Sequence, residues 1–202
     1  TYSVNTRWAA DSRDSATFPT KGWYRKLSAE VGIPPSDLTY YKTNFQSQFF
    51  YSLQTKKPYT FMWNVELGYG GGYGGNELPF YKNYYAGGVN SVRGFKTGSL
   101  GPRDENDDSK GGSRRFVNNF EIYAPLPGMK DDKSMRVGAF FDAGNIWGEN
   151  ENASFDTIRY SIGAAFTWIS PIGPLKIVYA KPLNEKPGDK VQNVQFQIGQ
   201  IF

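Results

Sequence analysis

The stretch Val191-Gln-Asn-Val-Gln-Phe-Gln-Ile-Gly-Gln-Ile-Phe202 decides the fold, because its side chains alternate between apolar and polar. One parity holds four apolar side chains: Val194, Phe196, Ile198 and Phe202. The other parity holds Gln195, Gln197 and Gly199. A β-strand with this pattern has one apolar and one polar face. A strand of about ten residues that ends in an aromatic ring is also what a tilted membrane-spanning β-strand requires.

Eight further segments show the same alternation and are separated by residues that favour turns. The expected strands cover residues 3–10, 23–33, 39–53, 61–69, 114–125, 135–147, 157–169 and 175–183. In the seventh, Gly163 and Ala165 share the polar parity, which indicates an inner face that something approaches closely. The pattern predicts an all-β, antiparallel sheet of about nine strands.

The connections between these strands differ in length in a regular way. Long or charged connections at residues 70–113, 148–156 and 184–190 alternate with mostly compact ones, although residues 11–21 are not short. Long loops at one rim and short turns at the other are typical of bacterial outer-membrane barrels. A soluble β-sandwich or small barrel is the alternative, but long strands with outward Trp and Tyr near their ends argue against it.

The composition excludes several classes of function. The chain has no His and no Cys, which excludes His-based catalysis, Ser-His triads, disulfides and thiolate metal sites. The net charge is only +4 and the basic residues are scattered along the sequence, so we expect no nucleic-acid partner. Mean hydropathy is −0.57, and the sequence has no apolar run near the ~20 residues that a transmembrane helix needs. Polar inward side chains lower mean hydropathy in a barrel, so this value does not argue against one. We expect no cofactor and no metal, and the acidic residues 104–108 and 148–156 lack EF-hand spacing, which favours solvation over cation binding.

Several motifs together carry a resemblance to a known family. They are Phe18-Pro-Thr-Lys-Gly22, Phe80-Tyr-Lys-Asn-Tyr-Tyr-Ala-Gly-Gly88, Val92-Arg-Gly-Phe95, Phe140-Phe-Asp-Ala-Gly-Asn-Ile-Trp147, Ser170-Pro-Ile-Gly-Pro-Leu175 and Gly188-Asp189. In this order, and with the terminal Val194-Gln-Phe-Gln-Ile-Gly199, they resemble the BamA family of outer-membrane insertases. The resemblance covers essentially all 202 residues.

The resemblance implies that residues 1–202 are the C-terminal part of a sixteen-stranded transmembrane barrel in the bacterial outer membrane. The chain begins without Met inside a strand-like pattern, so we expect a piece of a longer protein. The earlier barrel strands and the periplasmic POTRA domains have no counterpart here. Residues 70–113 would form an extracellular loop that folds into the lumen. Both ends of the sheet would be open edges, through which we expect the fragment to self-associate.

The resemblance also implies the functional residues. Val92, Arg93, Gly94 and Phe95 would form the lumen-loop motif, and Arg93 would meet the acidic Glu121 and Asp142 of the inner wall. The alternation independently places Glu121 and Asp142 on the polar face. Val194, Phe196, Ile198 and Phe202 would mark the terminal strand as an assembly signal and as one side of a lateral seam.

The implied function is the insertion of β-barrel proteins into the outer membrane, with no catalytic residue. Its expected partners are outer-membrane lipid, unfolded barrel clients and, through the longer protein, the lipoproteins of the assembly machinery. The alternatives are a TamA-like factor, a two-partner-secretion translocator or a passive porin. The turn at residues 170–174 and Gly188-Asp189 favour the BamA family over the first two, and the Arg-Gly-Phe motif disfavours a porin.

Overall fold

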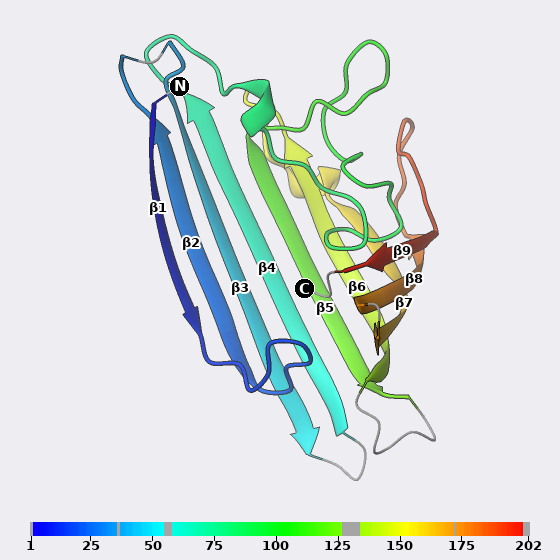
Figure 1. Cartoon of the computed structure of the whole chain (residues 1–202). Helices are drawn as coiled ribbons and strands as arrows, with labels where there is room; N and C mark the ends of the chain where they lie inside the picture. Colours follow the sequence, from blue (N-terminus) through cyan, green and yellow to red (C-terminus); the bar gives the residue numbers. More distant parts are fainter. Residues whose placement is uncertain (1, 36, 55–57, 127–133, 172, 200–202) are drawn as a thin grey trace.

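The computed structural model describes residues 2–199 except 36, 55–57, 127–133 and 172. The described part forms one curved antiparallel sheet in which each strand pairs with its neighbours in the sequence (Figure 1). The strands are β1 (Ser3–Asp11), β2 (Gly22–Gly32), β3 (Tyr40–Gln54), β4 (Pro58–Gly72), β5 (Arg114–Pro125), β6 (Met135–Trp147), β7 (Arg159–Ser170), β8 (Gly173–Pro182) and β9 (Val194–Ile198). Two single-turn 3₁₀ helices are η1 (Phe80–Lys82) and η2 (Phe155–Thr157). The prediction of an antiparallel all-β fold is confirmed.

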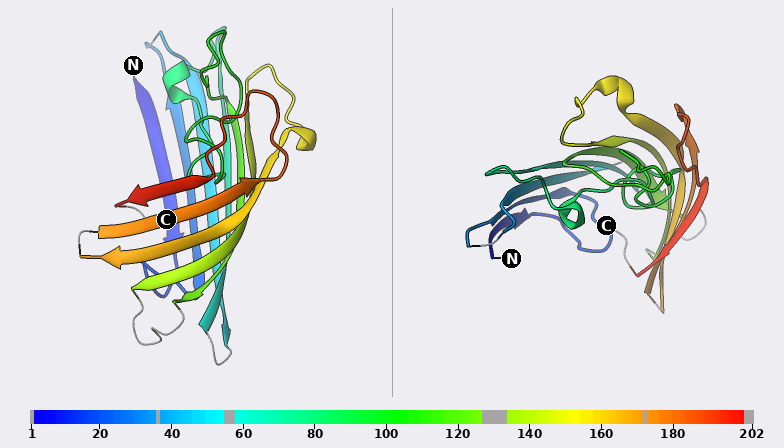
Figure 2. Two further views of the ribbon diagram at one scale, coloured as in Figure 1. Left: turned by 90° about the vertical axis from the view of Figure 1, so that its right-hand side faces the viewer. Right: turned by 90° about the horizontal axis from the view of Figure 1, so that it is seen from above.

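The sheet is open, with β1 and β9 as its two edges. Seen along the strands it forms an arc, with the β4–β5 connection inside it (Figure 2). No described helix is long and apolar enough to cross a membrane.

The two faces of the sheet differ in chemistry because the side chains alternate. The convex face displays apolar side chains in most strands, among them Trp8, Leu27, Phe49, Trp63, Leu67, Ile122, Ile162, Ile177 and Phe196. The concave face holds the buried polar side chains, among them Gln48, Asn64, Asn119, Glu121, Asp142, Ser161, Lys176 and Gln195. An exposed apolar face that extends over most strands of the sheet needs a protein partner or an apolar environment such as lipid.

The two rims also differ. The β2–β3, β4–β5, β6–β7 and β8–β9 connections lie at the rim drawn at the top of Figure 1, which we call the loop rim. At the opposite rim the β1–β2 turn folds inward over the concave face. Its Phe18 ring lies 4.2 Å from the Arg136 guanidinium, and the Tyr123 hydroxyl donates to the Pro19 carbonyl oxygen at 2.5 Å. The turn therefore covers the lower end of the concave face.

Most strand ends lie within two residues of where the alternation predicts them, and β5 and β6 match at both ends. β4 is three residues longer at each end than the predicted 61–69, so the long connection begins at residue 73 and not at residue 70. The terminal strand is the main correction: β9 spans only Val194–Ile198, so the predicted ten-residue strand starting at Val191 is wrong. Val191 instead bridges to Phe95 of the β4–β5 connection, and the chain bends at Gly199, whose φ is +96°. Phe202 lies outside the described residues. The seventh strand begins at Arg159 rather than Thr157, because η2 occupies residues 155–157.

Candidate functional site

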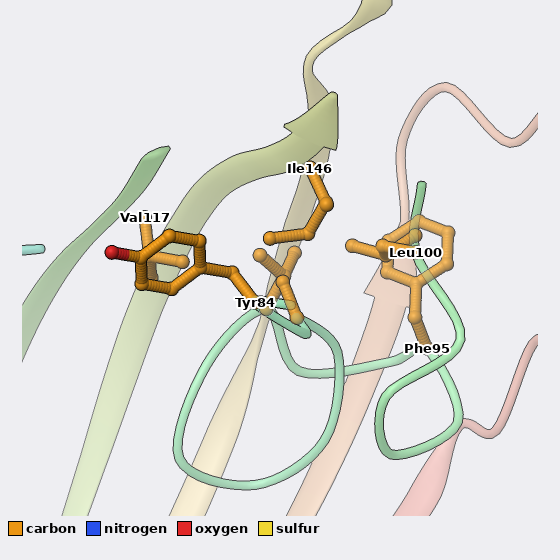
Figure 3. Packing of buried hydrophobic residues seen from close by; sticks show 7 residues of the cluster. Tyr84, Phe95, Leu100, Val117 and Ile146 are labelled. Atoms are coloured by element: carbon orange, nitrogen blue, oxygen red, sulfur yellow. The ribbon is translucent and has the colours of Figure 1, made fainter. Parts of the chain in front are cut away.

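The β4–β5 connection, residues 73–113, turns back from the loop rim and lies against the concave face (Figure 1). Short antiparallel bridges hold it together, Tyr84 with Gly112 and Ala86 with Leu100. Its apolar side chains form a buried cluster with two residues of the sheet, as Figure 3 shows. The members are Tyr84, Ala86, Val92, Phe95 and Leu100 from the loop, with Val117 of β5 and Ile146 of β6. This cluster attaches the loop to the inner side of the sheet.

Arg93 stands at the centre of the loop and is only 2% exposed. Its Nε and one terminal nitrogen both donate to Asp142 at 2.7 Å, and its backbone N–H donates to the same carboxylate at 3.0 Å. Its other terminal nitrogen donates to Glu121 at 2.6 Å. The guanidinium also lies 3.4 Å from the centre of the Phe140 ring. The structure thus brings Arg93, Glu121 and Asp142 together in one buried ion cluster.

This arrangement suits a guanidinium better than an ammonium group. The planar fork donates in parallel to the two oxygens of Asp142 and still has a donor for Glu121. Burial lowers the pKa of Arg93, but the adjacent Asp142 and Glu121 carboxylates raise it more, so the net pKa shift is upward. Arg93 therefore stays charged beside the Asp142 and Glu121 carboxylates.

Neighbouring polar groups complete the cluster. The Asn119 amide donates to Asp142 at 2.8 Å and to the Ser91 carbonyl oxygen of the loop at 2.7 Å. The Lys176 ammonium lies 3.9 Å from Glu121, so two buried cations face two buried anions. A charge-balanced, hydrogen-bonded cluster offsets much of the desolvation that an isolated buried charge would suffer.

A polar cavity of about 430 Å³ adjoins the cluster. Arg93, Glu121 and Lys176 lie in its wall together with Gln46 and Asn64. Within the described ranges, no group of three or more acidic, His or Cys side chains converges as metal ligands. The residues named in its wall are polar or charged, which differs from the largely apolar lining typical of small-molecule pockets.

The loop also contacts the last part of the chain. The Gln195 side-chain amide donates to the Phe95 carbonyl oxygen at 2.8 Å, and its carbonyl oxygen accepts the Gly94 N–H at 3.2 Å. The Gln192 N–H donates to the Gly94 carbonyl oxygen at 2.8 Å, and the Lys96 N–H donates to the Lys190 carbonyl oxygen at 2.7 Å. Gly94 has a φ of +91°, which most side chains disfavour, and this turn presents its backbone to both partners. The loop motif is thus a second partner of the terminal segment besides β8.

The predicted terminal-strand residues lie on the opposite face. Val194, Phe196 and Ile198 point to the convex side, and the Phe196 side chain is 74% exposed. Sequence reasoning placed Gln195 on the polar parity but missed its role, as it missed Asn119, Phe140 and Lys176. The spacing of about a hundred residues between Gln195 and Phe95 leaves no local signal for their contact.

Gln195→Ala is expected to lower the free energy of unfolding by about 1–3 kcal/mol, because it leaves two buried backbone groups of the loop without partners. Gln197→Ala is the matched control, since Gln197 has the same parity on β9 and pairs with Lys176 of β8. Hydrogen exchange should show faster exchange at Gly94 in Gln195→Ala alone. Equal exchange rates at Gly94 in the two variants would contradict this role.

Several known proteins are similar to this chain in sequence, and one solved structure is similar to it in fold. A family model described as the Omp85 superfamily domain matches residues 1–202. The chain is 37% identical to the outer membrane protein assembly factor BamA of Neisseria meningitidis, covering 100% of this chain and 29% of that protein. It is 28% identical to the human sorting and assembly machinery component 50 homolog, covering 99% of this chain and 45% of that protein. The crystal structure of BamA from Haemophilus ducreyi lacking POTRA domains 1–3 superposes with a TM-score of 0.88 at 30% identity, over 96% of this chain and 41% of that one.

Proposed function

The chain belongs to the Omp85 superfamily, and from this premise we propose that it forms part of a bacterial outer-membrane barrel that assembles and inserts other β-barrel proteins. The chain spans less than half of the curated relatives it matches, so this activity is proposed for the longer protein. Two relatives named for assembly support this proposal, one from Neisseria meningitidis and one from human. The main observation behind this proposal is the Arg93 ion cluster, which fixes the β4–β5 loop on the concave side of a sheet whose convex face is apolar.

The faces of the sheet support a place in the membrane. Strands of nine to fifteen residues in β1–β8 are long enough to cross the apolar core of a bilayer when tilted. The convex face presents apolar and aromatic side chains, while the polar groups gather on the concave face. We propose that the convex face contacts outer-membrane lipid, that the concave face lines the lumen and that the loop rim is extracellular. The nine strands would then be the C-terminal part of a sixteen-stranded wall.

The terminal strand supplies a mechanism that needs no catalytic residue. β9 has five residues and lies at the edge of the sheet, so its outer backbone groups can pair with another strand. Addition of an extended segment to such an edge is a known mode of recognition. We propose that a client strand pairs at β9. The apolar side chains Val194, Phe196 and Ile198 would favour client strands that have an apolar, lipid-facing side. The Arg93 cluster would hold the loop beside this edge. The lipoproteins of the machinery would bind the longer protein.

Reconstitution tests this function. The complete protein that contains residues 1–202 is placed in liposomes, an unfolded barrel client is added, and the heat-modifiable, protease-protected client is measured against empty liposomes. We expect a clear gain in inserted client. Ion conductance without such a gain would instead identify a passive porin and would contradict the proposal.

A further inference from the structure

The β6–β7 loop, residues 148–158, is placed differently from the other long connection. The β4–β5 connection lies within the arc of the sheet, whereas the β6–β7 loop reaches outward on the convex side (Figure 2). Its residue Ile158 is buried against Ala143 and Trp147, which have the convex parity of β6. Phe116, Phe141 and Tyr160 pack around this cluster, with the rings of Phe141 and Tyr160 5.9 Å apart. The base of the loop therefore continues the apolar convex face.

Hydrogen bonds fix the conformation of this loop. The Trp147 indole N–H donates to the Thr157 hydroxyl at 2.7 Å, and that hydroxyl donates to the Ser154 carbonyl oxygen at 2.7 Å. The Asn184 amide donates to the Ile158 carbonyl oxygen at 2.7 Å. The Ser154 hydroxyl caps η2 by accepting the Asp156 N–H. These hydrogen bonds fix the position of η2 relative to β6 and the β8–β9 loop.

Phe155 is the first residue of η2, and its side chain is 83% exposed. A large apolar ring held outward by a capped turn is costly in water and favourable in a lipid interface. In the proposed sixteen-stranded wall, further strands would adjoin β1 and β9, so none would lie directly beside the β6–β7 connection. Lys186 donates to the Asp156 carbonyl oxygen at 2.8 Å, which places an ammonium group against the backbone of η2. A cation at this point suits the anionic phosphates of lipid headgroups.

We propose that the β6–β7 loop rests on the outer surface of the bilayer, with the Phe155 ring inserted among the lipid headgroups. The inference depends on the proposed membrane orientation of the sheet, in which the loop rim is the outer rim. The loop would then hold this side of the wall at a fixed depth in the bilayer, away from the β9 edge at which client strands are proposed to pair.

Site-directed spin labelling tests this placement, because residues 1–202 contain no Cys. The complete protein, with any cysteine elsewhere replaced by serine, carries one label in phospholipid vesicles at Phe155→Cys, Phe80→Cys or Leu67→Cys. Phe80 is the matched control, since it is 77% exposed but belongs to η1 on the concave side. Leu67 lies on the convex face of β4 and reports whether the sheet is in lipid.

The measured quantity is the accessibility of each label to oxygen relative to a water-soluble nickel chelate. We expect this ratio to be several-fold higher at Phe155→Cys than at Phe80→Cys, and highest at Leu67→Cys. A high ratio at Leu67→Cys with equal, low ratios at the other two positions would overturn the loop inference and leave the membrane proposal standing. Low ratios at all three positions would overturn both.

Discussion

Arg93→Ala is expected to lower the free energy of unfolding by about 3–5 kcal/mol, because it leaves two buried carboxylates without their cation. Asp142 is completely buried, and among the described residues the remaining cation near Glu121 would be Lys176, at 3.9 Å. The loop would also lose the three hydrogen bonds that the Arg93 side chain donates to β5 and β6. The measurement is the temperature at which the folded, fast-migrating band disappears on a detergent gel, together with denaturant unfolding in the same detergent.

Two further variants make this test specific. Arg103→Ala removes a cation of the same loop whose partner Asp107 is largely exposed and four residues away. Arg103 also donates to the backbone carbonyl oxygens of Ser99 and Asp107, so a loss of about 1–2 kcal/mol is expected, less than for Arg93→Ala. Arg93→Lys keeps the charge but cannot donate to both oxygens of Asp142 in parallel, so it should fall between the wild type and Arg93→Ala. An Arg93→Ala protein as stable as Arg103→Ala would show that the ion cluster does not hold the loop.

Gly163→Ala is expected to lower the free energy of unfolding by about 3 kcal/mol, near the upper end for overpacked sites. A Cβ atom at Gly163 would lie 2.1 Å from the Tyr179 carbonyl oxygen and 2.6 Å from Cζ of Phe140. The first contact is with backbone, so a rotamer change cannot relieve it. The second would displace the ring on which the Arg93 guanidinium lies. The loss is measured by denaturant unfolding in detergent.

Gly75→Ala separates this packing effect from the loss of glycine's conformational freedom. Gly75 has a φ of +88°, but a Cβ there would meet nothing within 4 Å, so only the conformational cost of about 1 kcal/mol is expected. The Gly163→Ala variant should also raise hydrogen exchange at Arg93, whereas Gly75→Ala should not. Equal losses in the two variants would contradict close contact between Phe140 and the backbone of β7.

Local pattern was sufficient to predict most of the fold. Alternation places both ends of β5 and β6 and puts Glu121 and Asp142 on the inner face. The small residues Gly163 and Ala165 indicated a close approach, and Phe140 makes it, since its ring packs against both. In each case the signal lies within one strand, where parity alone determines which way a side chain points.

Contacts between distant segments could not be predicted in the same way. The start of β9 was misplaced because Val191 has a strand-like pattern but pairs with Phe95 of the loop instead of β8. Gln195 has the pattern of any inward polar side chain, and its partners are backbone groups about a hundred residues earlier. Backbone groups carry no residue-specific signal, so only the folded arrangement reveals these bonds. The meeting of Arg93 with its carboxylates was expected from the family resemblance and not from spacing.

The central claim is that client strands pair at the β9 edge, and disulfide cross-linking tests it most directly. A single cysteine is placed at Phe196 of β9 or at Ile177 of β8 in the complete protein, and an assembling client carries cysteines along its terminal strand. These two residues are direct cross-strand partners and both lie exposed on the convex face, one strand apart. The account predicts cross-links to Phe196→Cys at client positions two residues apart and none to Ile177→Cys. Equal cross-linking at both positions, or none at Phe196→Cys while clients insert, would contradict it.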